Sequence, residues 1–94
     1  MSSLQELYIH ENDIKDDGIA YISESDTFSN LQVLDVNGND LRETGAQMLS
    51  ATYIINQLRK LNIQNNHIGE LGCKVIAESD AFQLLSHLLI YSSN

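Results

Sequence analysis

Residues 4–22, LQELYIHENDIKDDGIAYI, decide the fold, because their pattern returns twice more along the chain. The second copy is LQVLDVNGNDLRETGAQML at residues 31–49, and the third is LRKLNIQNNHIGELGCKVI at residues 58–76. Each copy begins 27 residues after the one before it, without an insertion. A repeat of about 20 to 50 residues is typical of chains that stack similar small units. The sequence therefore predicts such a stack.

The repeat keeps apolar, asparagine and glycine positions in step. The apolar columns are Leu4, Leu31, Leu58 and Leu85, then Leu7, Leu34, Leu61 and Leu88, then Ile9, Val36, Ile63 and Ile90. The asparagines are Asn12, Asn39 and Asn66, with Ser93 in the fourth place, and the glycines are Gly18, Gly45 and Gly72. We therefore predict a single domain over residues 1–94, divided into repeats 4–30, 31–57 and 58–84 and a partial repeat 85–94.

Each unit begins with a pattern that predicts a short strand. Leu7 and Ile9 flank Tyr8, and such alternation is expected of a strand with one buried face. The asparagine that follows, Asn12 in the first unit, can bond the open backbone groups of a turn through its amide. Because stacked units would place these asparagines one above another, we expect an asparagine ladder inside the stack.

The second half of each unit predicts a short helix. Each glycine lies close to an acidic residue (Asp16, Glu43 or Glu70) that favours a helix N-terminus through the helix dipole and can cap it. The residues spaced to face inward from these helices are Ile19 and Ile22, Ala46 and Leu49, and Cys73 and Ile76. Cys73 is therefore expected to be a small buried hydrophobic residue. No base accompanies it that would make it a nucleophile.

In these features the chain resembles the ribonuclease-inhibitor-like subclass of leucine-rich repeat proteins, and the three quoted copies carry the resemblance. It implies an α/β solenoid, a right-handed superhelix with parallel strands on its concave face and helices on its convex face. Related repeats occur in intracellular inhibitors, innate immune receptors, GTPase-activating proteins and bacterial effectors. The resemblance therefore implies a protein–protein interaction scaffold that binds through its concave sheet and rims. The alternative is a structural fragment of a larger receptor, regulator or effector whose activity lies in other domains.

Residues that flank the buried positions of each strand are expected to point out of the sheet and to form the partner-binding surface. They are Glu6, Tyr8 and His10, then Val33, Asp35 and Asn37, then Lys60, Asn62 and Gln64, and finally His87, Leu89 and Tyr91. Tyr8 and Tyr91 are the candidate anchors, because tyrosine offers a large contact area with a polar tip. The alternative is that both are ordinary tyrosines of a sheet surface.

Composition narrows the class of partner and the location. The net charge of −8 disfavours nucleic acid and anionic membranes, which attract basic surfaces. The acidity serves solubility or, alternatively, a basic protein partner. The chain starts Met1-Ser2-Ser3, without the pattern of a signal peptide, and has one cysteine. These features predict the cytoplasm, or the host cytoplasm if the chain belongs to a secreted effector.

The size of the predicted sheet limits what it can bind alone. Four strands at about 4.8 Å spacing span roughly 15 Å, whereas a specific interface buries about 800 Å² on each partner. Neither Leu4 at the start nor HLLIYSSN at the end resembles the polar cap that a solenoid needs. We therefore expect self-association, or contact of at least one end with another chain or with further repeats.

No catalytic, metal or cofactor site is predicted. His10, His67 and His87 lie in different repeats without metal-ligand spacing, and His67 is expected in a solvated turn. The acidic run from Glu11 to Asp17 lacks the alternation of a calcium loop. Gly69 and Gly72 lack the lysine and hydroxyl residue of a nucleotide-binding loop. The sequence therefore predicts a protein that is not an enzyme.

Overall fold

Strands and helices alternate along the chain in the computed structural model, which describes residues 4–52 and 54–89. The elements are β1 (Glu6–Tyr8), α1 (Lys15–Glu24), the 3₁₀ helix η1 (Asp26–Phe28), β2 (Val33–Asp35), α2 (Glu43–Ser50), β3 (Lys60–Asn62), α3 (Gly69–Ala77), the 3₁₀ helix η2 (Asp80–Phe82) and β4 (His87–Leu89). Each of the first three strands is followed by its predicted turn and then leads into a helix.

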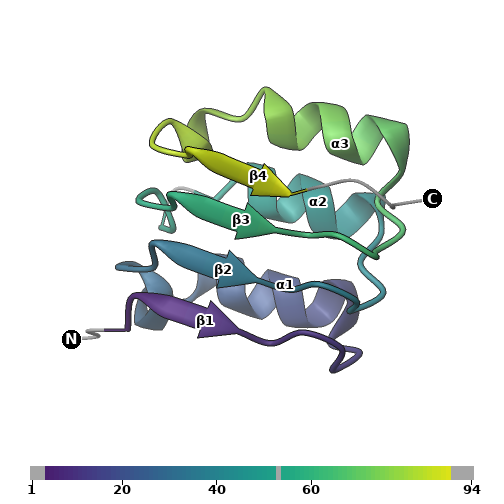
Figure 1. The fold of residues 1–94 in the computed structure, drawn as a ribbon, viewed down its shortest axis with the longest axis horizontal. Coiled ribbons are helices and arrows are strands. Elements are labelled where there is room, and N and C mark those ends of the chain that lie inside the picture. The colour runs from purple at the N-terminus through teal and green to yellow at the C-terminus, as the bar shows by residue number, and fades with distance from the viewer. Residues whose placement is uncertain (1–3, 53, 90–94) are drawn as a thin grey trace.

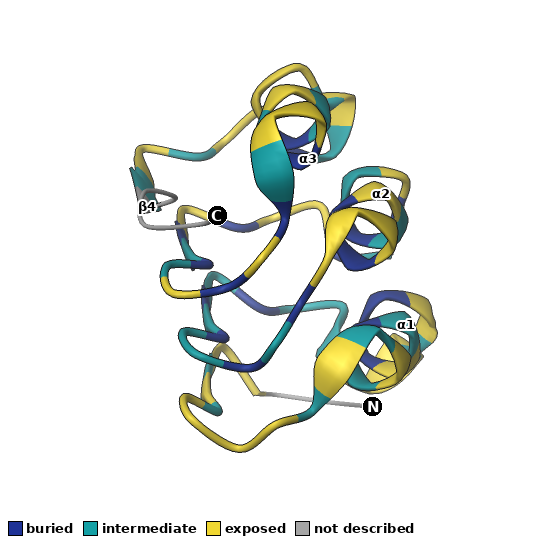
Figure 2. Ribbon diagram, turned by 90° about the vertical axis from the view of Figure 1, so that its right-hand side faces the viewer, coloured by how far each residue is buried: buried dark blue, intermediate teal, exposed yellow. Residues whose placement is uncertain are grey.

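The four strands form one parallel sheet in the order β1-β2-β3-β4 (Figure 1). Leu7 pairs with Leu34, Leu34 with Leu61, and Leu61 with Leu88, so every strand pair is in register with the 27-residue repeat. The sheet forms one layer and the helices form the other (Figure 2). One side of the sheet is therefore covered by helices, and the other is not. This arrangement confirms the predicted α/β architecture with a parallel sheet.

The hydrophobic core is deepest in the second and third repeats, because their residues have neighbours on both sides. Leu34 and Leu61 have no exposed surface. In the first repeat, Leu7 and Ile9 are half-buried and Leu4 is 39% exposed. Since a fully buried leucine contributes about 1.5–3 kcal/mol, the inner repeats supply most of the stability of the stack.

An asparagine ladder links the repeats at the ends of the strands, as the sequence predicts. Asn66 Oδ1 accepts the N–H groups of Asn39 and Leu41, each at 2.9 Å, and its Nδ2 donates to Val36 O at 3.1 Å. Asn39 repeats this one unit earlier, where its Oδ1 accepts Asn12 N–H at 2.9 Å. Each asparagine thus satisfies the backbone of the preceding repeat, which would otherwise be buried without partners.

Asn12 shows how the ladder depends on a preceding repeat. Its side chain is exposed and, among the described residues, bonds the His10 carbonyl alone, two residues back in its own turn, at 3.0 Å. Asn39 and Asn66 are 0% and 1% exposed. The same residue type in the same column therefore has a local role in the first repeat and a role between repeats in the next two.

A second ladder of hydroxyl groups lies at the C-terminal ends of the helices. Thr52 Oγ1 donates to the Ser23 carbonyl of α1 at 2.7 Å and accepts the N–H of Ile54 at 3.2 Å. Ser79 in the next repeat donates to the Ser50 carbonyl of α2 and accepts the Ala81 N–H. Helix C-termini leave carbonyls without partners inside the helix, so each hydroxyl caps the helix of the preceding repeat.

The predicted capping by acidic residues takes a different form in the structure. None of the three α-helices has a capping bond from the side chain of its own N-cap residue. Instead Asp16 Oδ1 accepts the N–H of Arg42, the N-cap residue of α2, at 2.9 Å. A β-carbon on Gly45 would collide with Asp16 Oδ1. The acidic and glycine columns therefore work together across two repeats.

Cys73 corrects the prediction of a buried hydrophobic residue, because it is only half-buried. Its equivalents Ile19 and Ala46 are 0% and 3% exposed. The reason is visible at Ala46, whose β-carbon lies against Gly72 of the following helix. This column is covered by the α-helix of the next repeat, and within residues 4–52 and 54–89 no further α-helix follows α3.

In the turn after each of the first three strands, one column has a left-handed backbone in every repeat. Glu11, Gly38 and Asn65 occupy this column with φ of 59°, 70° and 58°. Glycine and asparagine adopt this conformation readily, whereas glutamate is strained there. In this column the first repeat thus carries a local strain that the second and third repeats avoid. The predicted positions of Ile90, Tyr91 and Ser93 lie outside the described residues.

The candidate binding face of the sheet

The uncovered side of the sheet carries the predicted outward residues in rows that run across the strands. The first row is Glu6, Val33, Lys60 and His87, and the second is Tyr8, Asp35, Asn62 and Leu89. The exposed members of the predicted set are Glu6, Tyr8, His10, Lys60 and His87. The half-buried ones are Val33, Asp35, Asn37, Asn62 and Gln64. Tyr91 lies outside the described residues, and the side chain of Leu89 is not described.

Glu6 and Tyr8 are held together on β1. The Tyr8 hydroxyl donates to Glu6 Oε1 at 3.0 Å, although 52% of Tyr8 remains exposed. This hydrogen bond raises the pKa of Tyr8, and desolvation and the negative charges of Glu6 and Asp35 add to the effect. Tyr8 thus presents its ring to the surface with a fixed hydroxyl, as a contact anchor requires.

The side chains of Asp35 and Asn62 each accept a backbone N–H from the residue two positions later. Asp35 Oδ1 accepts the N–H of Asn37, and Asn62 Oδ1 accepts the N–H of Gln64, each at 3.0 Å. Asn37 in turn accepts a bond from Asn65 Nδ2 at 2.8 Å. These bonds stabilise the turns beyond the strands. The middle of the face is therefore preorganised, which lowers the entropic cost of binding.

Positive charge collects on the β3 side of the face. Lys60 is exposed in β3, its neighbour Arg59 is also exposed, and His87 is the partner of Lys60 in β4. In the described ranges, the lysine and arginine ion pairs are Lys15 with Asp13 and Arg42 with Asp40. Arg59 and Lys60 belong to neither, so both are available to a partner.

Comparison with known proteins identifies the repeat. A family model described as a leucine-rich repeat matches residues 1–23, 29–50 and 56–77, more than half of the chain. The chain belongs to the leucine-rich repeat family. No curated protein and no solved structure matches it. Leucine-rich repeats are generally protein-interaction modules and typically non-enzymatic scaffolds, so the uncovered sheet of this leucine-rich repeat chain is its candidate binding face.

The described part of this leucine-rich repeat chain assembles no metal centre. Its histidine, cysteine, aspartate and glutamate side chains form no group of three that could hold a metal ion there. His67 is exposed, as predicted, but it pairs with Arg42 in an isolated parallel β-bridge rather than lying in a turn, and its Nε2 is 4.0 Å from Asp40 Oδ1. No helix among the described residues is long and apolar enough to cross a membrane.

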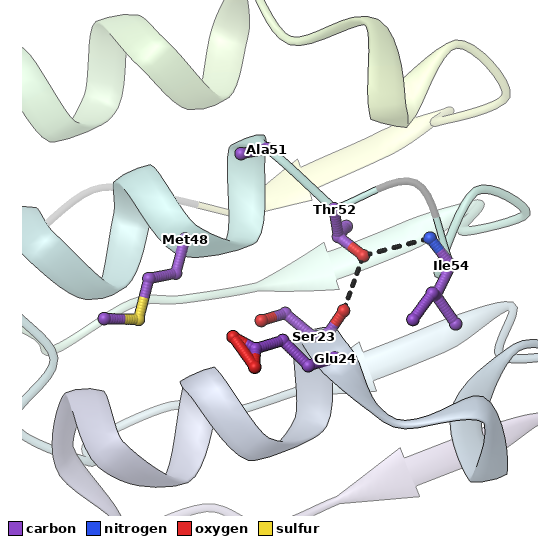
Figure 3. Close-up of a pocket in the computed structure, with 6 residues that line it drawn as sticks. All are labelled: Ser23, Glu24, Met48, Ala51, Thr52 and Ile54. Carbon is purple, nitrogen blue, oxygen red and sulfur yellow. Dashed lines mark hydrogen bonds between the residues drawn. The ribbon is translucent and has the colours of Figure 1, made fainter.

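A hollow of about 480 Å³ lies on the helix side, between the ends of α1 and α2 (Figure 3). Ser23, Glu24, Met48, Ala51, Thr52 and Ile54 line it. The Thr52 hydroxyl at its wall is already bonded to Ser23 O and to the N–H of Ile54. The Thr52 hydroxyl and the Ser23 carbonyl in this hollow therefore serve the stacking of the repeats.

Sequence reasoning missed Arg59 and the hydroxyl ladder. Arg59 shares a column with Gln5, Gln32 and Ser86, just before each strand, and was not among the expected outward residues. The hydroxyl column of Ser25, Thr52 and Ser79 is also visible in the sequence. Only the structure shows that Thr52 and Ser79 bond the preceding helix rather than their own turn alone.

Proposed function

We propose that this chain is a protein-interaction scaffold of the ribonuclease-inhibitor-like subclass, which binds a protein partner through the concave face of a right-handed superhelix in the cytoplasm. The observation that carries the proposal is the uncovered sheet face, where Tyr8 and the charged side chains of Glu6 and Lys60 stand exposed on a preorganised surface. The regular 27-residue register supports the subclass. The low number of basic residues, five against thirteen acidic ones, favours protein over nucleic acid as partner.

Two exposed tyrosines on opposite sides of the molecule provide a matched test. Tyr8 lies on the sheet face and Tyr21 on α1, with exposed fractions of 52% and 67%. Each is replaced in turn by the photo-crosslinking residue p-benzoylphenylalanine, and the cells are irradiated. The proposal predicts that position 8 forms an adduct with a partner protein and position 21 does not. Adducts at position 21 alone, or the same adducts at both positions, would refute the assignment of the face.

Self-association is a second candidate, and the width of the sheet favours it. Four strands span roughly 15 Å, and the longest dimension of the molecule is 36 Å. A single face of this size is small compared with the area of about 800 Å² that each partner buries in a specific interface. A second copy would enlarge the surface. Light scattering over a concentration series tests this candidate, because a constant monomer mass would exclude it.

A further inference from the structure

The first row of the binding face carries charges in a fixed order. Glu6 on β1 is acidic, Val33 on β2 is apolar, and Lys60 on β3 is basic, with His87 next to it on β4. We propose that this row, the charge row, binds an extended segment of a partner protein that carries a basic residue and, three residues away, an acidic residue. The proposal rests on the proposed function, because it names the chemistry of the partner at the same face.

The spacing follows from the geometry of the sheet. Glu6 and Lys60 lie on strands two apart, which places their backbones about 10 Å from each other at about 4.8 Å per strand. An unfolded segment in the polyproline II conformation rises about 3.1 Å per residue and presents every third side chain on one face. Residues three apart therefore lie about 9 Å apart and face the row together. In a β-strand, side chains on one face are about 7 or 13 Å apart, which fits the row less well.

Glu6 and Lys60, the two charged residues of the row, differ in their existing contacts and therefore in how each would bind the segment. Glu6 is held in place by the Tyr8 hydroxyl at 3.0 Å, so the basic residue of the segment meets an oriented carboxylate beside an aromatic ring. Lys60 is exposed and belongs to no ion pair among the described residues. Binding an acidic residue there breaks no existing contact. His87 is the partner of Lys60 on β4 and can add a further donor.

Val33 separates the two charges with a half-buried apolar surface. The two residues between the basic and the acidic residue of the segment would lie over Val33, where small or apolar side chains would pack. Asp35, the nearest acidic neighbour on the second row, is committed to the N–H of Asn37 at 3.0 Å. The row therefore favours one order of charges and penalises segments that are wholly basic or wholly acidic.

A random peptide library displayed on phage and selected on the immobilised chain tests the proposal. The enriched peptides are expected to carry an acidic residue three positions from a basic one, more often than two or four positions away. One enriched peptide, labelled with a fluorophore, is then titrated with variants by fluorescence polarisation. Lys60→Glu is expected to weaken binding about tenfold or more, because it replaces attraction by repulsion.

Lys74→Glu is the matched control, since Lys74 is exposed on α3 and the substitution changes the net charge by the same amount. It should leave the affinity within about twofold, a small free-energy difference. Lys60→Gln, which should weaken binding less than Lys60→Glu, guards against an effect on folding. Equal losses in the two glutamate variants, or an enriched pool without the three-residue spacing, would overturn the charge row.

Failure of this inference can be told apart from failure of the proposed function. If Tyr8→Ala abolishes peptide binding and Lys60→Glu does not, the sheet face binds proteins and the charge row is wrong. If no peptide is enriched, or none responds to either substitution, both are wrong. If Lys60→Glu instead abolishes a concentration-dependent increase in mass, the occupant is a second copy of this chain, which also overturns the inference.

Discussion

Replacing the ladder asparagines one at a time with alanine should cost stability in a graded order that reflects their contacts. The Asn66 side chain makes five hydrogen bonds, four of them buried. The Asn39 side chain makes four, each only partly buried. The Asn12 side chain makes one, which is exposed.

The magnitudes follow from these counts. A buried hydrogen bond contributes about 1 kcal/mol net, and we take about half of this where water can reach the freed groups. Asn66→Ala should therefore lower the free energy of unfolding by about 4 to 5 kcal/mol, Asn39→Ala by about 2 kcal/mol, and Asn12→Ala by at most about 0.5 kcal/mol. Since a small domain has about 5–15 kcal/mol in total, the first substitution should leave the chain barely folded.

Urea unfolding followed by circular dichroism measures the series. The midpoint should fall in the order Asn12, Asn39, Asn66, with similar slopes for the variants that remain folded. Asn12→Ala serves as the control, because it removes the same side-chain atoms at the equivalent position of the repeat. Equal losses at Asn12 and Asn66 would refute the reasoning, since they would show that the bonds between repeats contribute nothing beyond local turn structure.

Three further predictions concern the other contacts. Thr52→Val should lower the free energy of unfolding by about 1–2 kcal/mol in the same urea assay, because the hydroxyl that donates to Ser23 O and accepts the N–H of Ile54 is lost. Ser25 lies in the same column, but its described bond stays within its own turn. Ser25→Ala should therefore cost only about 0.5–1 kcal/mol. Glu11→Gly should raise the midpoint of thermal unfolding and increase the free energy of unfolding by about 0.5–1 kcal/mol, because glycine adopts the positive φ at this position without strain. A lower midpoint would contradict this. Glu6→Gln should lower the pKa of Tyr8 toward its ordinary value of 10.0 by removing the carboxylate that raises it. An absorbance titration, with Tyr8→Phe as the blank, measures this shift, and an unchanged titration would show that Glu6 is not the cause.

Much of the fold could be predicted from the repeat because buried columns are chosen by packing. Leu34 and Leu61 are buried in equivalent positions, and Asn66 repeats the bonds of Asn39 one unit later, so their spacing alone indicates their role. The α/β architecture and the strand register follow from this and are confirmed. The outward positions could also be named, because side chains alternate along a strand.

What the sequence could not show depends on contacts between units. Asp16 accepts a bond at the start of the helix of the next repeat rather than its own. The spacing between the acidic residue and the glycine does not reveal which of the two helices the carboxylate binds. Cys73 is half-buried because its column is covered from the following repeat. Arg59 was not predicted for the face, because it precedes β3 and alternates with Lys60; the structure shows only that it is exposed and belongs to neither the lysine nor the arginine ion pair of the described residues. Self-association and the location of the chain stay predictions.

Nuclear magnetic resonance mapping of a peptide selected by phage display tests the central claim, binding on the uncovered sheet face, most directly. The backbone amide chemical shifts of the isotope-labelled chain are followed as the peptide is added. We expect the largest changes in residues 6–8, 33–35 and 59–62 and at His87, with little change in α1, α2 and α3. Changes centred on the helices, with the strands unaffected, would contradict the account.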